Sequence, residues 1–181
     1  MVILGLETAA DESAVEALVE KCFGPGRFAK TAYRFREGVA PVAALSFVAR
    51  EGERIVGALR FWPVRIGDAP ALLLGPLAVE PALRSKGIGL GLMIMALAKA
   101  TRDGHRFVLL VGDEPYYARA GFRKAPRERF QFPGPVDPAR LLIRELVPGA
   151  LHDMAGAVSK ALTSAGVGVD TTQRLHRSAG A

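Results

Sequence analysis

Residues 74–101 read LGPLAVEPALRSKGIGLGLMIMALAKAT, and this stretch decides how the rest of the sequence is interpreted. It begins inside an apolar segment, 71–79, whose length and composition predict a β-strand. A basic segment with three glycines follows at 84–91. Residues 90–101 are apolar at nearly every position, which predicts a helix buried on all sides. The pattern is therefore a strand, a glycine-rich turn and a buried helix.

The glycine-rich turn has the properties of an anion site. The start of a helix leaves about four backbone N–H groups without a partner inside the helix, and the helix dipole favours negative charge there. Glycines at 87, 89 and 91 remove side chains that would keep a bulky anion away from these groups. We therefore predict that a diphosphate lies on the amides of residues 86–90. The predicted phosphate-binding residues are Arg84, Ser85, Lys86, Gly87, Ile88, Gly89 and Leu90.

A second interpretation of the turn is that its glycines only let the helix pack closely on the sheet. The cations Arg84 and Lys86 and the apolar helix directly behind the turn favour the anion site. A dinucleotide site expects G-x-G-x-x-G immediately after the first strand, and the spacing here is G-x-G-x-G. The sequence also lacks G-x-x-x-x-G-K-[ST], which excludes a P-loop.

The remaining segments predict a mixed α/β fold. We expect strands at 2–6, 45–49, 55–64, 71–79, 107–111 and 141–147. We expect helices that begin at Asp11, span 28–37 and 90–101, and occupy 115–120. The buried face of the first helix is predicted as Ala14, Ala17, Leu18 and Cys22. One domain is expected over residues 1–162, with a flexible C-terminal tail over 163–181.

Composition restricts the partners. The net charge of +6 favours an anionic partner, but the basic residues are scattered, which argues against extended nucleic-acid binding. No secretory signal opens the chain, and no apolar run approaches the ~20 residues that cross a bilayer, so we expect a soluble cytoplasmic protein without a membrane partner. A single cysteine, Cys22, excludes an intramolecular disulfide. His105, His152 and His176 show no metal-ligand spacing, so no metal site is expected.

Two motifs resemble those of the GNAT superfamily of N-acetyltransferases. Arg84-Ser85-Lys86-Gly87-Ile88-Gly89 fits the family pattern [Q/R]-x-x-G-x-[G/A] between a central strand and its following helix. Tyr117 stands four residues ahead of Gly121-Phe122, which is similar to the second family signature. The segment 112–117 also resembles a subgroup of predicted bacterial acetyltransferases with a Gly-Asp-x-x-Tyr-Tyr turn. Two motifs in the right order are more specific than either alone, and the resemblance covers at least residues 1–130.

The resemblance implies the GNAT acyl-CoA N-acyltransferase fold, a twisted, mostly antiparallel sheet flanked by helices with a central strand splay. It also implies an N-acetyltransferase that uses acetyl-CoA (coenzyme A) as cosubstrate. The pantetheine arm would lie between the strand that ends at Val79 and the strand at 107–111, against the backbone of Leu77, Ala78 and Val79. The acetyl group would pass by direct attack to an amine, and Tyr117 would be the general acid.

Several roles stay open in the sequence. Tyr117 is interpreted as an acid, although it could instead anchor the short helix by packing. Some family members place a carboxylate base on the central strand where this chain has Gly75; Glu37, Glu80, Asp113, Glu114 or a water chain are the alternatives. We expect the acceptor amine near 28–36, the strand end 60–63 and Tyr116, with Phe61 and Trp62 as an apolar wall or as core residues.

The acceptor's identity and the assembly state also stay open. A polyamine, an amino acid, an antibiotic and a protein N-terminus are all compatible with the sequence, and the strand at 141–147 could form a homodimer edge. A non-catalytic acyl-CoA sensor and, less favoured, a nucleotide- or nucleic-acid-binding domain are the alternative functions.

Overall fold

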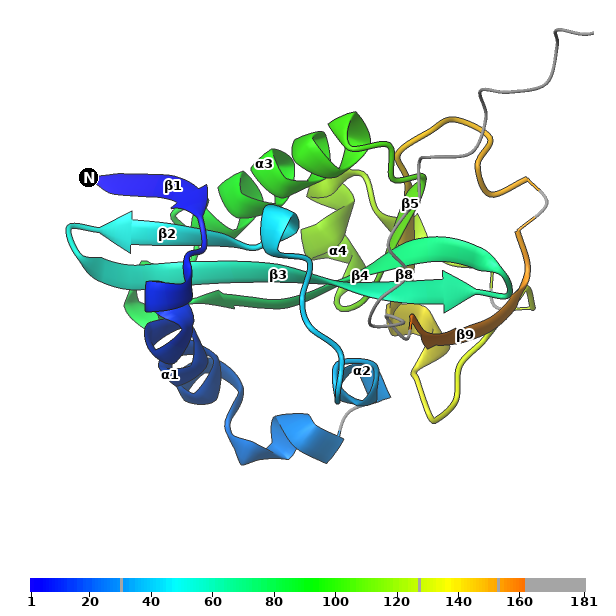
Figure 1. Ribbon diagram of the computed structural model, residues 1–181, viewed down its shortest axis with the longest axis horizontal. Coiled ribbons are helices and arrows are strands. Elements are labelled where there is room, and N and C mark those ends of the chain that lie inside the picture. The colour runs from blue at the N-terminus through cyan, green and yellow to red at the C-terminus, as the bar shows by residue number, and fades with distance from the viewer. Residues whose placement is uncertain (30, 127, 153, 162–181) are drawn as a thin grey trace, which may run out of the picture.

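A nine-stranded sheet forms the centre of the computed structural model, which describes residues 1–29, 31–126, 128–152 and 154–161 (Figure 1). The main strand order is β1-β2-β3-β4-β5-β8-β6, while β9 pairs with β3 and β7 pairs with β9. The strands are β1 (Val2–Leu6), β2 (Phe47–Glu51), β3 (Arg54–Ile66), β4 (Ala69–Val79), β5 (Phe107–Val111), β6 (Arg123–Lys124), β7 (Phe130–Gln131), β8 (Leu141–Glu145) and β9 (Gly156–Lys160). All pairs are antiparallel except β4 with β5 and β7 with β9. The predicted mixed fold with a mostly antiparallel sheet is confirmed.

Helices cover both faces of this sheet. The α-helices are α1 (Glu12–Phe23), α2 (Thr31–Arg34), α3 (Ile88–Arg102) and α4 (Glu114–Tyr117). The 3-10 helices are η1 (Ala9–Asp11), η2 (Pro25–Ala29), η3 (Ala43–Leu45), η4 (Pro81–Leu83), η5 (Ala118–Ala120) and η6 (Pro138–Arg140). The long helices α3 and α1 lie on opposite sides of the strands (Figure 1). Each therefore buries a different face of the same central strands.

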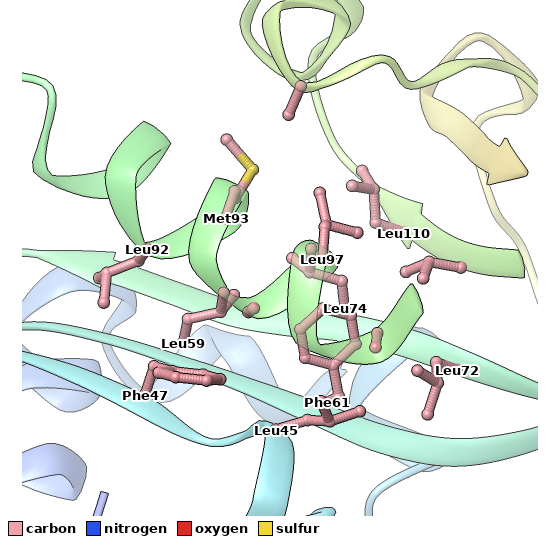
Figure 2. Packing of buried hydrophobic residues seen from close by; sticks show 14 of the residues in the cluster. Leu45, Phe47, Leu59, Phe61, Leu72, Leu74, Leu92, Met93, Leu97 and Leu110 are labelled. Atoms are coloured by element: carbon pink, nitrogen blue, oxygen red, sulfur yellow. The ribbon is translucent and has the colours of Figure 1, made fainter. Parts of the chain in front are cut away.

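Helix α3 packs on the sheet through one face. Figure 2 shows Leu92 directed at Leu59 of the central strands, and Leu92, Met93 and Leu97 all belong to the buried cluster that α3 forms with those strands. The opposite face of α3 is in solvent, where Ile94 is 54% exposed and Met95 37% exposed. The prediction that this helix is buried on all sides is therefore wrong, because only one helix face can contact a sheet and no other layer covers the second face.

Helix α1 forms where the sequence predicts it, and its buried face is the predicted one only in part: Leu18 is buried and Cys22 packs against the same cluster. Val15, Leu18 and Val19 are buried, whereas Ala14 and Ala17 are exposed. The larger β-branched residues bury more apolar surface per side chain than alanine, so they decide how the helix is turned. Gly24 ends the helix with a φ of 62°, in the left-handed region that favours glycine.

Two further expectations are corrected. The single helix expected at 28–37 is divided into η2, the four-residue α2 and a turn that contains the buried Phe35. The late strand β8 is not a free edge, because it pairs with β5 along its length and with β6 at Leu142 and Ile143. The predicted C-terminal tail, 163–181, and His176 lie outside the described residues. Among the residues described, no helix is long and apolar enough to cross a bilayer.

Candidate active site

The site begins where β4 separates from β5. These parallel strands pair only at Leu72 with Val108 and at Leu73 with Leu109. Beyond that point β4 keeps its pairing with β3 and continues to Val79 without β5. The register between β3 and β4 shifts opposite Gly75 and Pro76, and such irregularities bend a strand. One edge of β4 is consequently open beside the end of β5, as the expected splay requires.

A cleft of about 420 Å³ lies at the end of β4, and we call it the turn cleft. Its wall contains all but one of the residues predicted to bind the anion and the arm beside it. These are Leu77, Ala78, Val79, Arg84, Ser85, Gly87, Ile88, Gly89 and Leu90. Lys86 is exposed and is not part of the wall. The turn therefore brings the predicted residues together, with Arg84 as the cation of the motif that faces the cleft.

The backbone of the turn presents hydrogen-bond donors to this cleft. Gly87 is the N-cap of α3 with a φ of 80°, and Ser85 has a φ of 67°, which is uncommon for a residue with a side chain. The first helical hydrogen bond runs from Gly91 N to Gly87 O at 2.9 Å. The amides of residues 88–90 precede it and therefore have no acceptor within the helix, and no described side chain caps them. They point at the position predicted for the diphosphate.

Five wall residues of the turn cleft were not predicted from the sequence: Cys22, Phe23, Leu83, Tyr116 and Arg119. The Cys22 thiol donates to the carbonyl of Val79 at 3.4 Å, so the end of α1 is joined to the end of β4. The Tyr116 hydroxyl lies over Gly89, where a β-carbon would collide with it. Cys22 gave no signal in the sequence, because it belongs to a helix about fifty residues from the strand that it contacts. Tyr116 is adjacent to the motif residue Tyr117, but the direction of its side chain depends on how α4 is rotated.

Tyr117 lies behind this wall and lines neither cleft described here. Its ring fills the space beside Gly112 and makes an edge contact with Phe122, with ring centroids 6.1 Å apart. Burial raises the pKa of Tyr117 to about 12, and the charges of Arg140 and Arg36 partly oppose that rise. The phenol is therefore protonated at neutral pH.

A second cleft of about 320 Å³ adjoins the first, and we call it the arginine cleft. Arg27, Arg36 and Arg140 line it together with Gly75 and Pro76 of β4. The carboxylate of Asp137 is the only one among the described residues that line it. Leu77 and Phe23 belong to the walls of both clefts. The two spaces therefore meet where β4 leaves β5.

Known proteins share this arrangement. The profile of the acetyltransferase (GNAT) domain family matches residues 43–124, from η3 through β6, and so includes the splayed strands, the turn and α3. The chain carries a GNAT acetyltransferase domain. This confirms the family resemblance, whereas membership of the Gly-Asp-x-x-Tyr-Tyr subgroup stays a prediction.

Solved structures resemble the GNAT domain over most of its length. A GNAT family N-acetyltransferase (YhbS) from Escherichia coli, in complex with CoA, is 25% identical with a TM-score of 0.74, over 88% of this chain and 89% of that one. A GNAT family acetyltransferase from Brucella melitensis, in complex with acetyl-CoA, is 26% identical with a TM-score of 0.61, over 82% of this chain and 90% of that one. The ribosomal-protein-S18-alanine N-acetyltransferase of Escherichia coli shares the fold at 15% identity and a TM-score of 0.56, over 81% and 94% of the two chains. No curated protein sequence matches significantly.

The carboxylates considered as bases in the sequence lie in ion pairs and line neither cleft. Glu80 pairs with Lys21 at 2.6 Å, Asp113 with Arg140 and Glu114 with Lys124 at 3.2 Å, and Glu37 with Lys160 at 4.0 Å. Three of these four acids face a lysine at the surface, which is the usual environment of a solvated acid. Asp137 was missed because the loop that carries it has no motif.

The residues predicted to surround the acceptor in the GNAT domain are divided by the structure. Phe61 and Trp62 are buried core residues, and Trp62 Nε1 donates to Gly75 O at 2.6 Å. Tyr116 lies in the turn cleft and not in the arginine cleft. From the segment expected near the acceptor, Ala32, Tyr33 and Arg36 line the arginine cleft. That segment therefore borders a cavity, although its residues are not one helix, and the acceptor's place there stays a prediction.

Proposed function

We propose that the chain transfers an acetyl group from acetyl-CoA to an amine by direct attack. The observation that carries this proposal is the row of three amides without a helical partner, at residues 88–90, in the wall of the turn cleft. The turn cleft would hold the cosubstrate and the arginine cleft the acceptor amine. Because Leu77 and Phe23 border both clefts, the two reactants would meet there.

The turn cleft fits a diphosphate chemically. Three N–H groups at a helix start bind an anion well. Gly87 leaves open space where a side chain would stand, while the Tyr116 hydroxyl lies over Gly89. Arg84 and Arg119 line the same cleft and supply positive charge at its rim. The solved Escherichia coli and Brucella melitensis structures, which are complexes with CoA and acetyl-CoA, support CoA and its acetyl thioester as the ligand.

The open edge of β4 fits the arm that connects the diphosphate to the thioester. An extended ligand can add to an exposed strand edge through backbone hydrogen bonds, for which side-chain identity matters little. The backbone of Leu77, Ala78 and Val79 would serve here. The thiol of Cys22 already donates to the Val79 carbonyl, so the remaining backbone groups of this segment would carry most of the contact.

Acetyl-CoA supplies the activated acetyl group, and the chain's residues would position it and manage two protons. The neutral amine nitrogen forms a bond to the carbonyl carbon, the carbon–sulfur bond breaks, and sulfur needs a proton. Tyr117 keeps its proton at neutral pH, and the family motif makes it the proposed donor to the departing sulfur, although Tyr116 is the tyrosine that lines the turn cleft. The amine gives up its proton, and the proposed acceptor is Asp137, which lines the arginine cleft and whose Oδ1 also accepts from Ala139 N at 2.9 Å.

Calorimetric titration with CoA tests the proposed site. Gly87→Glu should remove measurable binding, because it places a carboxylate among the amides that would hold the diphosphate. Gly87→Ala is the matched control: it adds the left-handed strain of about 1–2 kcal/mol without the charge, so it should weaken binding only modestly. If Gly87→Glu bound CoA as the parent does, the turn would not be the site. Thiol release with a panel of amines then tests transfer itself.

A further inference from the structure

Arg36 is a half-buried cation that the acetyl-transfer chemistry does not use. It lies in the turn after α2 and lines the arginine cleft. Its Nε atom is buried and has no hydrogen-bond partner among the described residues. A buried donor without a partner costs free energy, and a buried charge without one costs more. Such a group is retained when a ligand completes it.

The surroundings hold the Arg36 guanidinium in one place. Its Cζ lies 5.9 Å from the ring centroid of Trp62, and Trp62 is fixed by its hydrogen bond to the Gly75 carbonyl. Nη2 of Arg36 lies 2.8 Å from the position that a β-carbon on residue 75 would take. Gly75 therefore leaves room for the guanidinium where some GNAT enzymes are expected to carry a carboxylate base. The chain has a cation at this position in place of a base.

The charges around Arg36 do not compensate it. Burial lowers the pKa of Arg36 to about 10, the charge of Arg60 adds to this effect, and Tyr33 and Glu16 oppose it only in part. Arg60 is the internal comparison, since it is more deeply buried than Arg36 but contacts Glu7 and Glu16. Burial lowers the pKa of Arg60 too, yet these two carboxylates raise it overall. Arg60 is neutralised inside the fold, and Arg36 is not.

Within the arginine cleft, Arg36 is also the cation available to a ligand. Arg27 pairs with Glu20 and donates to the Gly24 carbonyl, and Arg140 pairs with Asp113. Arg27 and Arg140 are thus neutralised by partners outside the lining, which leaves Arg36 and the carboxylate of Asp137 as the charges that face a ligand. A polyamine has no group that could pair with Arg36. One cation and one carboxylate in the same lining favour an amine that also carries an anion.

We propose that the acceptor is a small amine that bears a carboxylate, an amino acid or a close analogue, and that Arg36 binds its carboxylate. This inference rests on the proposed acetyl transfer and names the substrate class of the same site. A guanidinium pairs with a planar carboxylate through two parallel hydrogen bonds, which fixes orientation as well as affinity. With its carboxylate at Arg36 and Gly75, the acceptor would extend its amine along β4 toward Leu77, where the two clefts meet. The products are an N-acetylated amino acid and the free thiol of CoA.

Thiol release with matched acceptors tests the proposal in the full chain. Each standard amino acid is compared with its carboxamide and with O-phosphoethanolamine. We expect kcat/KM to be about 10- to 100-fold higher for the preferred amino acid than for its carboxamide. Arg36→Gln should remove that preference, and Arg36→Lys should keep part of it. Arg54→Gln is the matched control, because Arg54 is exposed and pairs with Glu51 at the far end of β3, and it should keep the full preference.

A binding measurement separates this proposal from the one on which it rests. The N-acetyl derivatives of the amino acids and their carboxamides are titrated into parent and Arg36→Gln, each first shown to be folded by its thermal transition. Binding that needs both the carboxylate and Arg36 supports the proposed carboxylate site. If no amine is acetylated but this binding is found, only the acetyl-transfer proposal fails. Four outcomes overturn the proposal that Arg36 binds a carboxylate. They are equal binding of acid and amide, binding unchanged in Arg36→Gln, no binding at all, and turnover of the phosphate-bearing amine alone.

Discussion

Adjacent tyrosines in this chain have different environments and, on our proposal, different roles. Tyr116 is 37% exposed and its hydroxyl lies in the turn cleft over Gly89. Tyr117 is mostly buried between Gly112 and Phe122, within reach of the charges of Arg36 and Arg140. Burial raises the pKa of both phenols, more for Tyr117. Position in the cleft would favour Tyr116 as the proton donor, whereas the spacing to Gly-Phe favours Tyr117.

Matched phenylalanine variants decide between the two tyrosines. Removal of a general acid costs about 100-fold or more in rate, so Tyr117→Phe should lower kcat by that factor with little change in KM for the amine. Tyr116→Phe should keep kcat within a few-fold and act mainly on CoA affinity. Because the pKa of Tyr117 is raised to about 12, its proton is retained as pH rises from 7 to 10, and the parent's kcat should not fall over that range through loss of the phenol proton. The reverse pattern, a large loss only in Tyr116→Phe, would assign the acid to Tyr116.

At the scale of elements, the segment from β4 to α3 was predictable because its parts are local. Strand, turn and helix follow one another within 34 residues, from Ala69 to Arg102, and the amide donors belong to the backbone of that segment. The sequence does not predict which side of α3 faces the sheet, because the helix is apolar on several faces. Leu97 is 1% exposed and Ile94 is 54% exposed, although the sequence predicted a helix buried on all sides. Contact with the strands, and not hydropathy alone, sets the rotation of the helix.

This rotation of α3 gives a direct stability prediction. Leu97→Ala removes a side chain packed in the cluster beneath the helix (Figure 2), so unfolding free energy should fall by about 2–5 kcal/mol. Ile94→Ala makes the same kind of truncation three residues earlier on the exposed side, so it should change stability by about 0.5 kcal/mol or less. Urea unfolding of both variants measures the difference. Similar losses would show that α3 is covered on both sides in solution.

At the scale of the whole molecule, the site is assembled from segments far apart in the chain. The arginine cleft combines α1, the turn after α2, β4 and the loop before β8. The family motifs lie only in the turn cleft and beside Tyr117, so the sequence predicted the cosubstrate half of the site much better than the acceptor half. Arg36 illustrates the reason. Its role depends on Gly75 and Trp62, which lie 39 and 26 positions away, and no spacing rule connects the three residues.

On our proposal, Arg60 stabilises the fold through ion pairs, whereas Arg36 serves ligand binding. Arg60 joins β3 to the segment after β1 and to α1, with Nε at 2.9 and 3.1 Å from the Glu7 carboxylate oxygens and Nη1 bonded to Glu16. Arg60→Met would leave Glu7 buried and unpaired, so it should cost about 3–5 kcal/mol of unfolding free energy. Arg36→Met replaces an uncompensated half-buried cation with an apolar side chain of similar length, so stability should stay within about 1 kcal/mol of the parent or rise.

Urea unfolding at neutral pH without ligand measures both arginine variants, and acceptor titration of Arg36→Met completes the comparison. We expect Arg36→Met to keep or gain stability and to lose carboxylate-dependent binding. That result would show that Arg36 serves binding at a cost to stability. A loss from Arg36→Met as large as that from Arg60→Met would instead make Arg36 a structural residue. The arginine cleft would then have no cation free to bind a substrate carboxylate, since Arg27 and Arg140 are already paired.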